Sequence, residues 1–211
     1  MTAPLSGRKA QAARNDRLIV EAAREVFVAD PTAPVAAVAE RAGVGISALY
    51  RRYPSKEDLL RKLCADGLEL YTKIVETAVH DEGDPWEAFA TFMRDVVDAD
   101  THSITMALAG TFTPSAELYE MSTRAGQLNE ELVSRTRRAG VIRPDLDVGD
   151  LGALFEQLAV ISVGDAARTR DVRQRYLTII LDGLRIPPTT TPLPSIAPTL
   201  EERAGRWTPR S

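Results

Sequence analysis

Side chains that donate hydrogen bonds gather in one short stretch near the amino end of the chain. They are Ser47, Tyr50, Arg51, Arg52, Tyr53 and Lys56, with no acidic residue between them. Guanidinium, ammonium, hydroxyl and phenol groups donate to phosphate oxygens, and several of them also reach base edges in the major groove of DNA. The stretch therefore predicts non-covalent contact with a nucleic-acid duplex rather than a reaction.

The apolar spacing around this cluster predicts two short helices joined by a tight turn. The buried stripe of the first helix repeats at three and four residues and consists of Val35, Val38 and Ala39. Gly43 fits a left-handed helix stop because it has no Cβ, and Gly45 is an acceptable N-cap for the next helix. That second helix, from Ile46 to Tyr53, is too short to be stable alone, so Leu49 must hold it against its neighbours.

The stretch AERAGVGISALYRRYPSKEDLL resembles the helix-turn-helix core of the tetracycline-repressor (TetR) family of bacterial regulators. The shared features are an alanine-rich positioning helix, the Ala42-Gly43-Val44 turn, the Leu49-Tyr50 pair, the aromatic Tyr53 and the opening Ser55-Lys56-Glu57 of a long next helix. The resemblance covers residues 15 to 63. An ordinary helical hairpin is the alternative, but it needs no particular residues at its turn and no clustered aromatic and basic tip.

The resemblance implies an all-α fold with an N-terminal three-helix DNA-binding module, which contains the helix-turn-helix, and a larger C-terminal helical domain for ligand binding and dimerisation. It implies DNA contacts from Thr32, Gly45, Ile46, Ser47, Ala48, Tyr50, Arg51, Arg52, Tyr53 and Lys56. Ser47 and Ala48 would lie near base edges, and the other polar side chains mainly near phosphates, with Arg51 able to contact either. The chain departs from the family at Asp30-Pro31, at Ala33-Pro34 and at Ala48, where the family often has glycine, a hydroxyl and a polar residue.

Charge is distributed unevenly along the chain. Residues 1–63 carry eleven Lys/Arg and seven Asp/Glu, a net charge of +4, whereas the remaining residues carry fifteen and twenty-three, a net charge of −8. A polyanion would be attracted to one end of the molecule and repelled by the other, as expected of a DNA-binding module attached to a body that does not bind DNA. The overall charge of −4 is thus compatible with DNA binding.

The remaining composition narrows the class of protein. The amino end has no apolar signal segment and the chain has no apolar run near twenty residues, so we expect a cytoplasmic protein with no membrane contact. Cys64 has no partner cysteine and is expected in the core. His80 and His102 lack the spacing of metal ligands and are expected at the surface, so we predict no metal site, no cofactor and no catalytic residue.

Helical periodicity continues through most of the chain. We expect a flexible basic arm at residues 1–14, the helix-turn-helix domain at 15–54, the effector-binding and dimerisation domain at 55–186 and a Pro/Thr-rich disordered tail at 187–211. The first helix should begin after an N-cap at Asn15 or Asp16, and Ser55 should cap the long helix that joins the two domains. Further helices are expected at about 85–98, 102–111, 115–138, 148–164 and 168–186.

Large aromatic and thioether side chains recur on several helices of the second domain. The candidates for an effector pocket are Phe89, Phe92, Met93, Met106, Phe112, Met121 and Phe155. A cavity among helices is a common small-molecule site, and these side chains would suit an apolar or planar molecule. Simple core packing is the alternative for each of them.

The last two helices carry wide apolar stripes. The candidates for a homodimer interface are Leu151, Leu154, Leu158, Tyr176, Ile180 and Leu184. Such stripes form either a two-fold four-helix bundle with a second subunit or packing within one chain. We favour the dimer, because one two-turn recognition helix offers too few contacts for specific DNA affinity.

These observations together predict a ligand-responsive repressor that binds a palindromic operator in double-stranded DNA as a homodimer and is released by a small-molecule effector. An activator, or a regulator without an effector, would carry the same DNA-binding module. An all-helical enzyme is the rival from another class, but the sequence contains no nucleophile-base motif, no phosphate-binding loop and no metal-ligand spacing.

Overall fold

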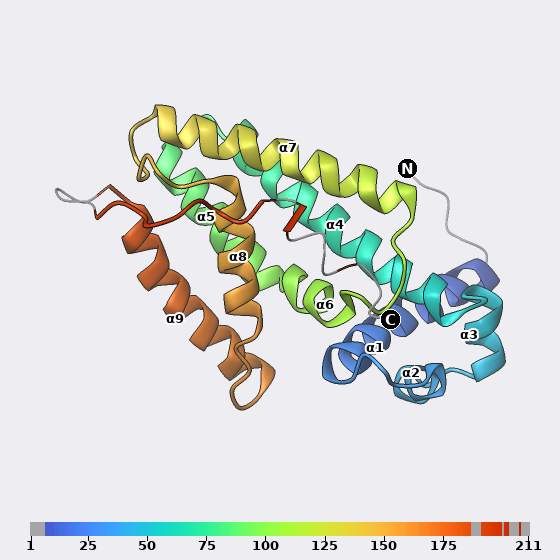
Figure 1. Cartoon of the computed structure of the whole chain (residues 1–211). Coiled ribbons are helices and arrows are strands. Elements are labelled where there is room, and N and C mark those ends of the chain that lie inside the picture. The colour runs from blue at the N-terminus through green and yellow to red at the C-terminus, as the bar shows by residue number, and fades with distance from the viewer. Residues whose placement is uncertain (1–6, 187–190, 200, 203–206, 208–211) are drawn as a thin grey trace.

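The computed structural model describes residues 7–186, 191–199, 201–202 and 207, and the side chains from residue 10 onward. These residues form nine α-helices: α1 (Gly7–Ala29), α2 (Val35–Ala42), α3 (Ile46–Arg52), α4 (Lys56–His80), α5 (Pro85–Ala99), α6 (Thr101–Leu108), α7 (Ala116–Arg138), α8 (Val148–Ala159) and α9 (Ala166–Leu184). Figure 1 shows α1 to α3 at one end of the molecule and α5, α8 and α9 at the other, with α4 and α7 running between them. The all-α class predicted from the sequence is confirmed in the described residues.

Helix α1 begins earlier than the sequence predicts. It starts at Gly7, so residues 7–14, which were expected to be part of a flexible arm, are helical. Asp16 is therefore inside the helix rather than its N-cap, and its carboxylate is directed at another helix. Residues 1–6 of the expected arm lie outside the described part of the chain.

The turn between α2 and α3 has the geometry that its glycines predict. Gly43 adopts φ 65° and ψ 31°, the left-handed conformation, and its N–H donates to carbonyls at the end of α2. Gly45 is the N-cap of α3, with extended backbone angles of −65° and 137°. Leu49 is the one residue of α3 that is buried, so this single side chain anchors the helix.

Helix α4 takes part in two hydrophobic cores. Ser55 caps it in a capping box with Asp58, as the hydroxyl at this position predicts. Its first half contributes Leu59, Leu60, Leu63 and Cys64 to a core shared with α1, α2, α3 and α6. Its second half contributes Tyr71, Val75 and Ala78 to the core of the body. The helix is thus part of both packed units.

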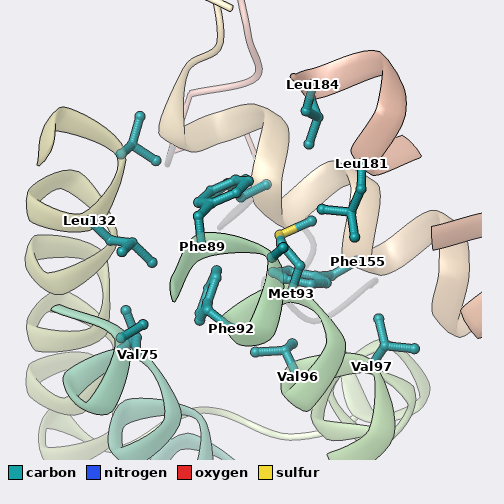
Figure 2. Close-up of a cluster of buried hydrophobic side chains, with 14 of the residues drawn as sticks. Val75, Phe89, Phe92, Met93, Val96, Val97, Leu132, Phe155, Leu181 and Leu184 are labelled. Carbon is teal, nitrogen blue, oxygen red and sulfur yellow. The ribbon is translucent and has the colours of Figure 1, made fainter. Parts of the chain in front are cut away.

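The body core is rich in aromatic side chains. Figure 2 shows Phe89, Phe92 and Met93 of α5 with Val75 and Leu132 on one side and Phe155 of α8 and Leu181 of α9 on the other. Tyr71, Phe92 and Phe155 meet edge to face, with ring centroids 5.8 to 6.4 Å apart, the geometry that aromatic rings prefer.

Two predictions about burial have different outcomes. Cys64 is in the core, as expected, and desolvation raises the pKa of its thiol to about 12. His102 is not a free surface residue: its ring lies 4.9 Å from that of Phe155 and 5.6 Å from that of Tyr71. Its position one residue into α6 directs it toward the body core.

The carboxyl-terminal part of the body differs from the sequence expectation. Helix α8 ends at Ala159 rather than near residue 164, and α9 begins at Ala166. The tail was expected to be disordered, yet residues 191–199 form an extended segment that contacts the body through Asp145 and Gly149. Residues 187–190 of that tail lie outside the described part. Within the described residues, no helix is long and apolar enough to cross a membrane.

Candidate nucleic-acid interface

Helix α3 buries a single side chain, so its polar side chains face solvent. Leu49 is 0% exposed, whereas Ile46 and Tyr50 are 40% and 46% exposed. Ser47 and Arg51 are exposed as well, and Arg51 makes no ion pair in the described part of the chain. Gly45 is exposed and Ala48 half-buried at the same helix. The exposed hydroxyl, phenol and guanidinium groups of α3 therefore share one solvent-facing surface.

Arg52 and Tyr53, at the end of α3, are bound to α1. The Arg52 guanidinium donates to the two carboxylate oxygens of Asp16 at 2.6 and 3.3 Å, and the Tyr53 hydroxyl donates to the same carboxylate at 2.8 Å. The Arg52 hydrogen bond is the main reason that the pKa of Asp16 is lowered, although burial opposes it, and burial raises the pKa of Tyr53. Asp16 thus fixes the end of α3 against α1.

This cluster changes the expected role of Tyr53. The sequence predicts a phosphate contact, but the side chain is buried and its hydroxyl proton is already donated to Asp16. Arg52 remains exposed, with part of its charge neutralised by the same carboxylate. Sequence analysis did not identify Asp16 as a site residue, because it predicted that Asp16 would cap the start of the first helix.

We expect the contribution of Asp16 to stability to depend on pH. Its pKa in the folded chain lies below the ordinary value of 3.8, so the carboxylate stabilises the fold above that value and the stabilisation is lost as pH falls through the folded pKa. Chemical unfolding of the native chain and of Asp16→Asn should therefore give a stability difference that is largest near neutral pH and shrinks below pH 3.8.

The control for this prediction is Glu21→Gln on the same helix. Glu21 pairs with Arg17 at 3.7 Å, with both side chains more than half exposed, so little stability depends on it. A pH-independent difference for Asp16→Asn would show that the carboxylate charge does not hold α3.

Lys56 and Thr32 are also engaged within the chain. The Lys56 ammonium donates to the carbonyls of Pro31 and Ala33 at 3.0 and 2.8 Å, and it lies 5.0 Å above the ring of Phe27. The Thr32 hydroxyl donates to Asp30 at 2.6 Å. An ammonium has three N–H donors, so one donor of Lys56 remains for a phosphate. Lys56 therefore fixes the loop before α2, and its DNA contact stays a prediction.

The structure divides the expected effector-pocket residues between the two cores. Phe89, Phe92, Met93 and Phe155 lie in the body core, whereas Phe112 and Met121 pack into the core that α4 shares with the amino-terminal helices. Met106 is half-buried on α6. A cavity next to Phe155 has a volume of about 10 Å³, room for about one water molecule. The seven residues therefore do not belong to a single core in the described part of the chain.

The expected dimer residues also divide into two groups. Leu151, Leu158 and Leu184 are buried inside the subunit, because α8 and α9 use these positions to pack on α5. Tyr176 is 49% exposed, and Leu154 and Ile180 are half-buried. Ile179, which belongs to the apolar stripe of α9 in the sequence, is exposed. Val160 and Val163 in the loop between α8 and α9 are exposed as well, and sequence reasoning did not assign them to the interface.

The turn between α5 and α6 connects the body to α1. Asp100 adopts φ 50°, which is uncommon for a residue with a side chain. Its carboxylate accepts a hydrogen bond from Arg173 of α9 at 2.6 Å, and its carbonyl accepts one from Arg24 of α1. Arg173 is 9% exposed and also donates to the carbonyls of Ala159 and Ile161. The turn is thus held by charged groups from both ends of the molecule.

Comparisons with known proteins agree with this geometry. Residues 19–63 match the family model of bacterial regulatory proteins, tetR family, and residues 84–186 match the C-terminal domain of SbtR-like transcriptional regulators. The chain is 30% identical over 173 residues to the HTH-type transcriptional repressor LfrR of Mycolicibacterium smegmatis, across 81% of this chain and 88% of that protein.

Solved structures give the same result. The TetR transcription regulatory protein from Mycobacterium vanbaalenii is 30% identical, with a TM-score of 0.56 over 84% of this chain and 99% of that one. LfrR from Mycobacterium smegmatis, solved in complex with proflavine, is 25% identical, with a TM-score of 0.57 over 79% of this chain and 95% of that one. The helix-turn-helix, the long connecting helix and these matches together establish that the chain belongs to the TetR family of bacterial transcriptional regulators.

Proposed function

We propose that this regulator is a repressor that binds a two-fold symmetric operator as a homodimer and leaves it when a small molecule enters the body. The observation that carries the proposal is the exposed polar face of α3, where Ser47, Tyr50 and Arg51 stand free of the core while Leu49 holds the helix from behind. Such a face suits base edges and phosphates of the major groove.

Dimerisation is supported by apolar side chains that the single chain leaves exposed. Val160, Val163 and Ile179 are 65%, 46% and 59% exposed, and Tyr176 lies on the same helix as Ile179. Exposed apolar residues on α9 and in the loop that precedes it favour an interface with a second copy. Two recognition helices related by a two-fold axis would read half-sites about 34 Å apart or a multiple of that distance.

The small molecule is proposed to bind at the aromatic core of the body. Phe92 and Phe155 offer ring faces and edges suited to an apolar or planar compound, and LfrR, a relative of this chain, was solved with the planar compound proflavine. The cavity of about 10 Å³ beside Phe155 is far below the volume of about 300 Å³ or more that a small-molecule site needs, so binding requires an opening of this core.

Footprinting of the region upstream of the chain's own gene tests the proposal. We expect two protected half-sites related by a two-fold axis, and loss of protection when an effector is added. Protection that persists with every apolar metabolite tested would favour a regulator without an effector, an alternative that the closely filled body core supports. An activator would raise rather than lower expression of a reporter placed behind the same DNA.

Arg51 and Arg52 should differ in their effects on DNA binding. Arg51 is exposed without an ion-pair partner in the described residues, whereas Arg52 is paired with Asp16 at 2.6 Å. Each phosphate contact contributes about 0.9 to the slope of log affinity against log salt concentration. We expect Arg51→Ala to reduce the slope by about that amount and Arg52→Ala to reduce it by less.

Titration of operator DNA at several salt concentrations measures both slopes. Equal reductions for the two variants would mean that Arg52 leaves Asp16 for a phosphate when DNA binds. No reduction for Arg51→Ala would remove that residue from the interface.

A further inference from the structure

The chain beyond α9 returns along the body as an extended segment, residues 191–199, which we call the strap (Figure 1). Its starting point is fixed by pairing with the loop between α7 and α8. The Arg143 N–H donates to the Leu184 carbonyl at 2.9 Å, and Ile186 N–H donates to the Val141 carbonyl at 3.4 Å. The chain therefore leaves α9 in a defined direction.

An ion pair holds the first part of the strap. The Arg143 guanidinium donates to both carboxylate oxygens of Asp145, at 2.6 and 3.1 Å, and to the Thr191 carbonyl at 2.7 Å. The same Asp145 carboxylate accepts the Leu193 N–H at 2.9 Å. These hydrogen bonds, with the Arg143 contact the strongest, lower the pKa of Asp145. Arg143 and Asp145 thus bind the backbone of the strap on both sides of Pro192.

A glycine of α8 accommodates the last part of the strap. A Cβ placed on Gly149 would lie 2.1 Å from the Pro198 carbonyl oxygen and 3.2 Å from the Cβ of Ala197. The first of these distances is impossible for real atoms, and its partner is backbone, which has little freedom to move aside. The strap can therefore dock here because residue 149 has no side chain.

The far end of the tail contacts the other core. Thr199 and Glu202 form a reciprocal pair of hydrogen bonds: the Thr199 N–H donates to the Glu202 carboxylate at 2.7 Å, and the Glu202 N–H donates to the Thr199 hydroxyl at 3.2 Å. Trp207 packs edge to face on Phe112, with ring centroids 5.8 Å apart. Phe112 belongs to the core that α4 shares with the DNA-binding helices. The described parts of the tail thus reach from the α7–α8 loop to the turn after α6.

The strap docks on α8, the helix that contributes Phe155 to the aromatic core that an effector would have to enter. At 100° per residue, Gly149 and Gly152 share the face of α8 next to the one that directs Val148 and Phe155 into the core. Opening that core requires some element to move. The helices that surround it bury large apolar side chains, whereas most strap residues are exposed and held by a few polar contacts, so the strap is the element that costs least to displace.

We propose that the strap is an autoinhibitory cover that must leave Gly149 before a small molecule enters the body core. The docking follows from the contacts of the strap with Arg143, Asp145 and Gly149, whereas the gating role rests on the proposed effector site. A closed state reduces the apparent affinity of a ligand in proportion to the fraction of open molecules, so release of the strap should strengthen binding.

Three full-length variants test whether the strap is docked and whether it controls access to the body core. Gly149→Ala places a methyl group where the Pro198 carbonyl lies. Leu193→Pro removes the backbone N–H that donates to the Asp145 carboxylate, at a residue whose side chain is exposed. Gly126→Ala in α7 is the matched control, since a Cβ there meets nothing within 4 Å. Alanine favours a helix over glycine, so without a docked strap both glycine variants would behave alike and melt at or above the native temperature.

Quenching of tryptophan fluorescence by acrylamide reports docking, because Trp207 becomes more accessible when the tail leaves while Trp86 stays buried. We expect greater quenching in Gly149→Ala and Leu193→Pro than in the native chain and in Gly126→Ala. Equal quenching in all four proteins would overturn the docked strap.

The dye 1-anilinonaphthalene-8-sulfonate reports access to the core. We expect its dissociation constant to fall by about fivefold or more in the two strap variants, with helical content unchanged by circular dichroism. Equal affinity in all four proteins would overturn the gating role and leave the effector site standing. Failure of the dye to bind any of them would count against the proposed effector site itself.

Discussion

Replacing Leu49 by alanine is expected to weaken specific operator binding strongly while the helical body stays folded. Leu49 is the buried residue of α3, and loss of a buried leucine costs about 2 to 5 kcal/mol. A helix of seven residues has no stability of its own, so the cost falls on the docking of α3. We expect operator affinity to fall by up to about a hundredfold in a gel-shift titration.

A second leucine provides the control for this result. Leu70 lies on α4, is 40% exposed and belongs to the body half of that helix, so Leu70→Ala should leave operator affinity unchanged. Circular dichroism should show nearly native helix content for both variants. Operator binding by Leu49→Ala at native strength would mean that DNA contacts alone hold α3 in place.

The second large effect is expected at Arg173. Its guanidinium donates to Asp100, Ala159 and Ile161, and the side chain is 11% exposed. Removing Arg173 leaves the Asp100 carboxylate and two carbonyl oxygens without their hydrogen-bond donor. Breaking a buried ion pair costs about 3 to 5 kcal/mol of folding stability, and we expect a value near the low end because the Asp100 side chain is 37% exposed to solvent. We expect Arg173→Ala to melt about 6 to 12 °C lower than the native chain.

Arg175→Ala is the comparison for this measurement, because Arg175 lies on the same helix with its side chain exposed. Its melting temperature should stay within about 2 °C of the native value. A similarly small change for Arg173→Ala would show that water replaces its three hydrogen bonds. The Asp100 turn would then be held by Arg24 alone among the charged groups described here.

The parts of this fold that sequence predicts are those fixed by local chemistry. Gly43 and Ser55 act through their own backbone and hydroxyl, so their roles follow from residue type and neighbours. The start of α1 and the role of Asp16 depend on packing between helices. A signal for Asp16 was nevertheless present, since it lies three, seven and eleven residues before Ile19, Ala23 and Phe27, on the buried face of the helix.

Burial of a helix stripe does not reveal which partner covers it. Leu151 and Tyr176 both belong to apolar stripes in the sequence, yet the first packs on the chain's own α5 and the second is half exposed. The pocket residues show the same limit, because Phe89 and Phe112 are alike in type and lie in different cores. Residue type and period identify an apolar face, and only the tertiary arrangement assigns its neighbour.

Helix α4, which is anchored at both ends in different cores, has a mechanical consequence. Its 25 residues form a rod about 37 Å long, so a tilt of about 5° imposed at the body end would swing the other end by about 3 Å. In a symmetric pair of subunits the two swings add. If the subunits pair as proposed, a tilt of α4 caused by opening of the body core would change the distance between the two copies of α3.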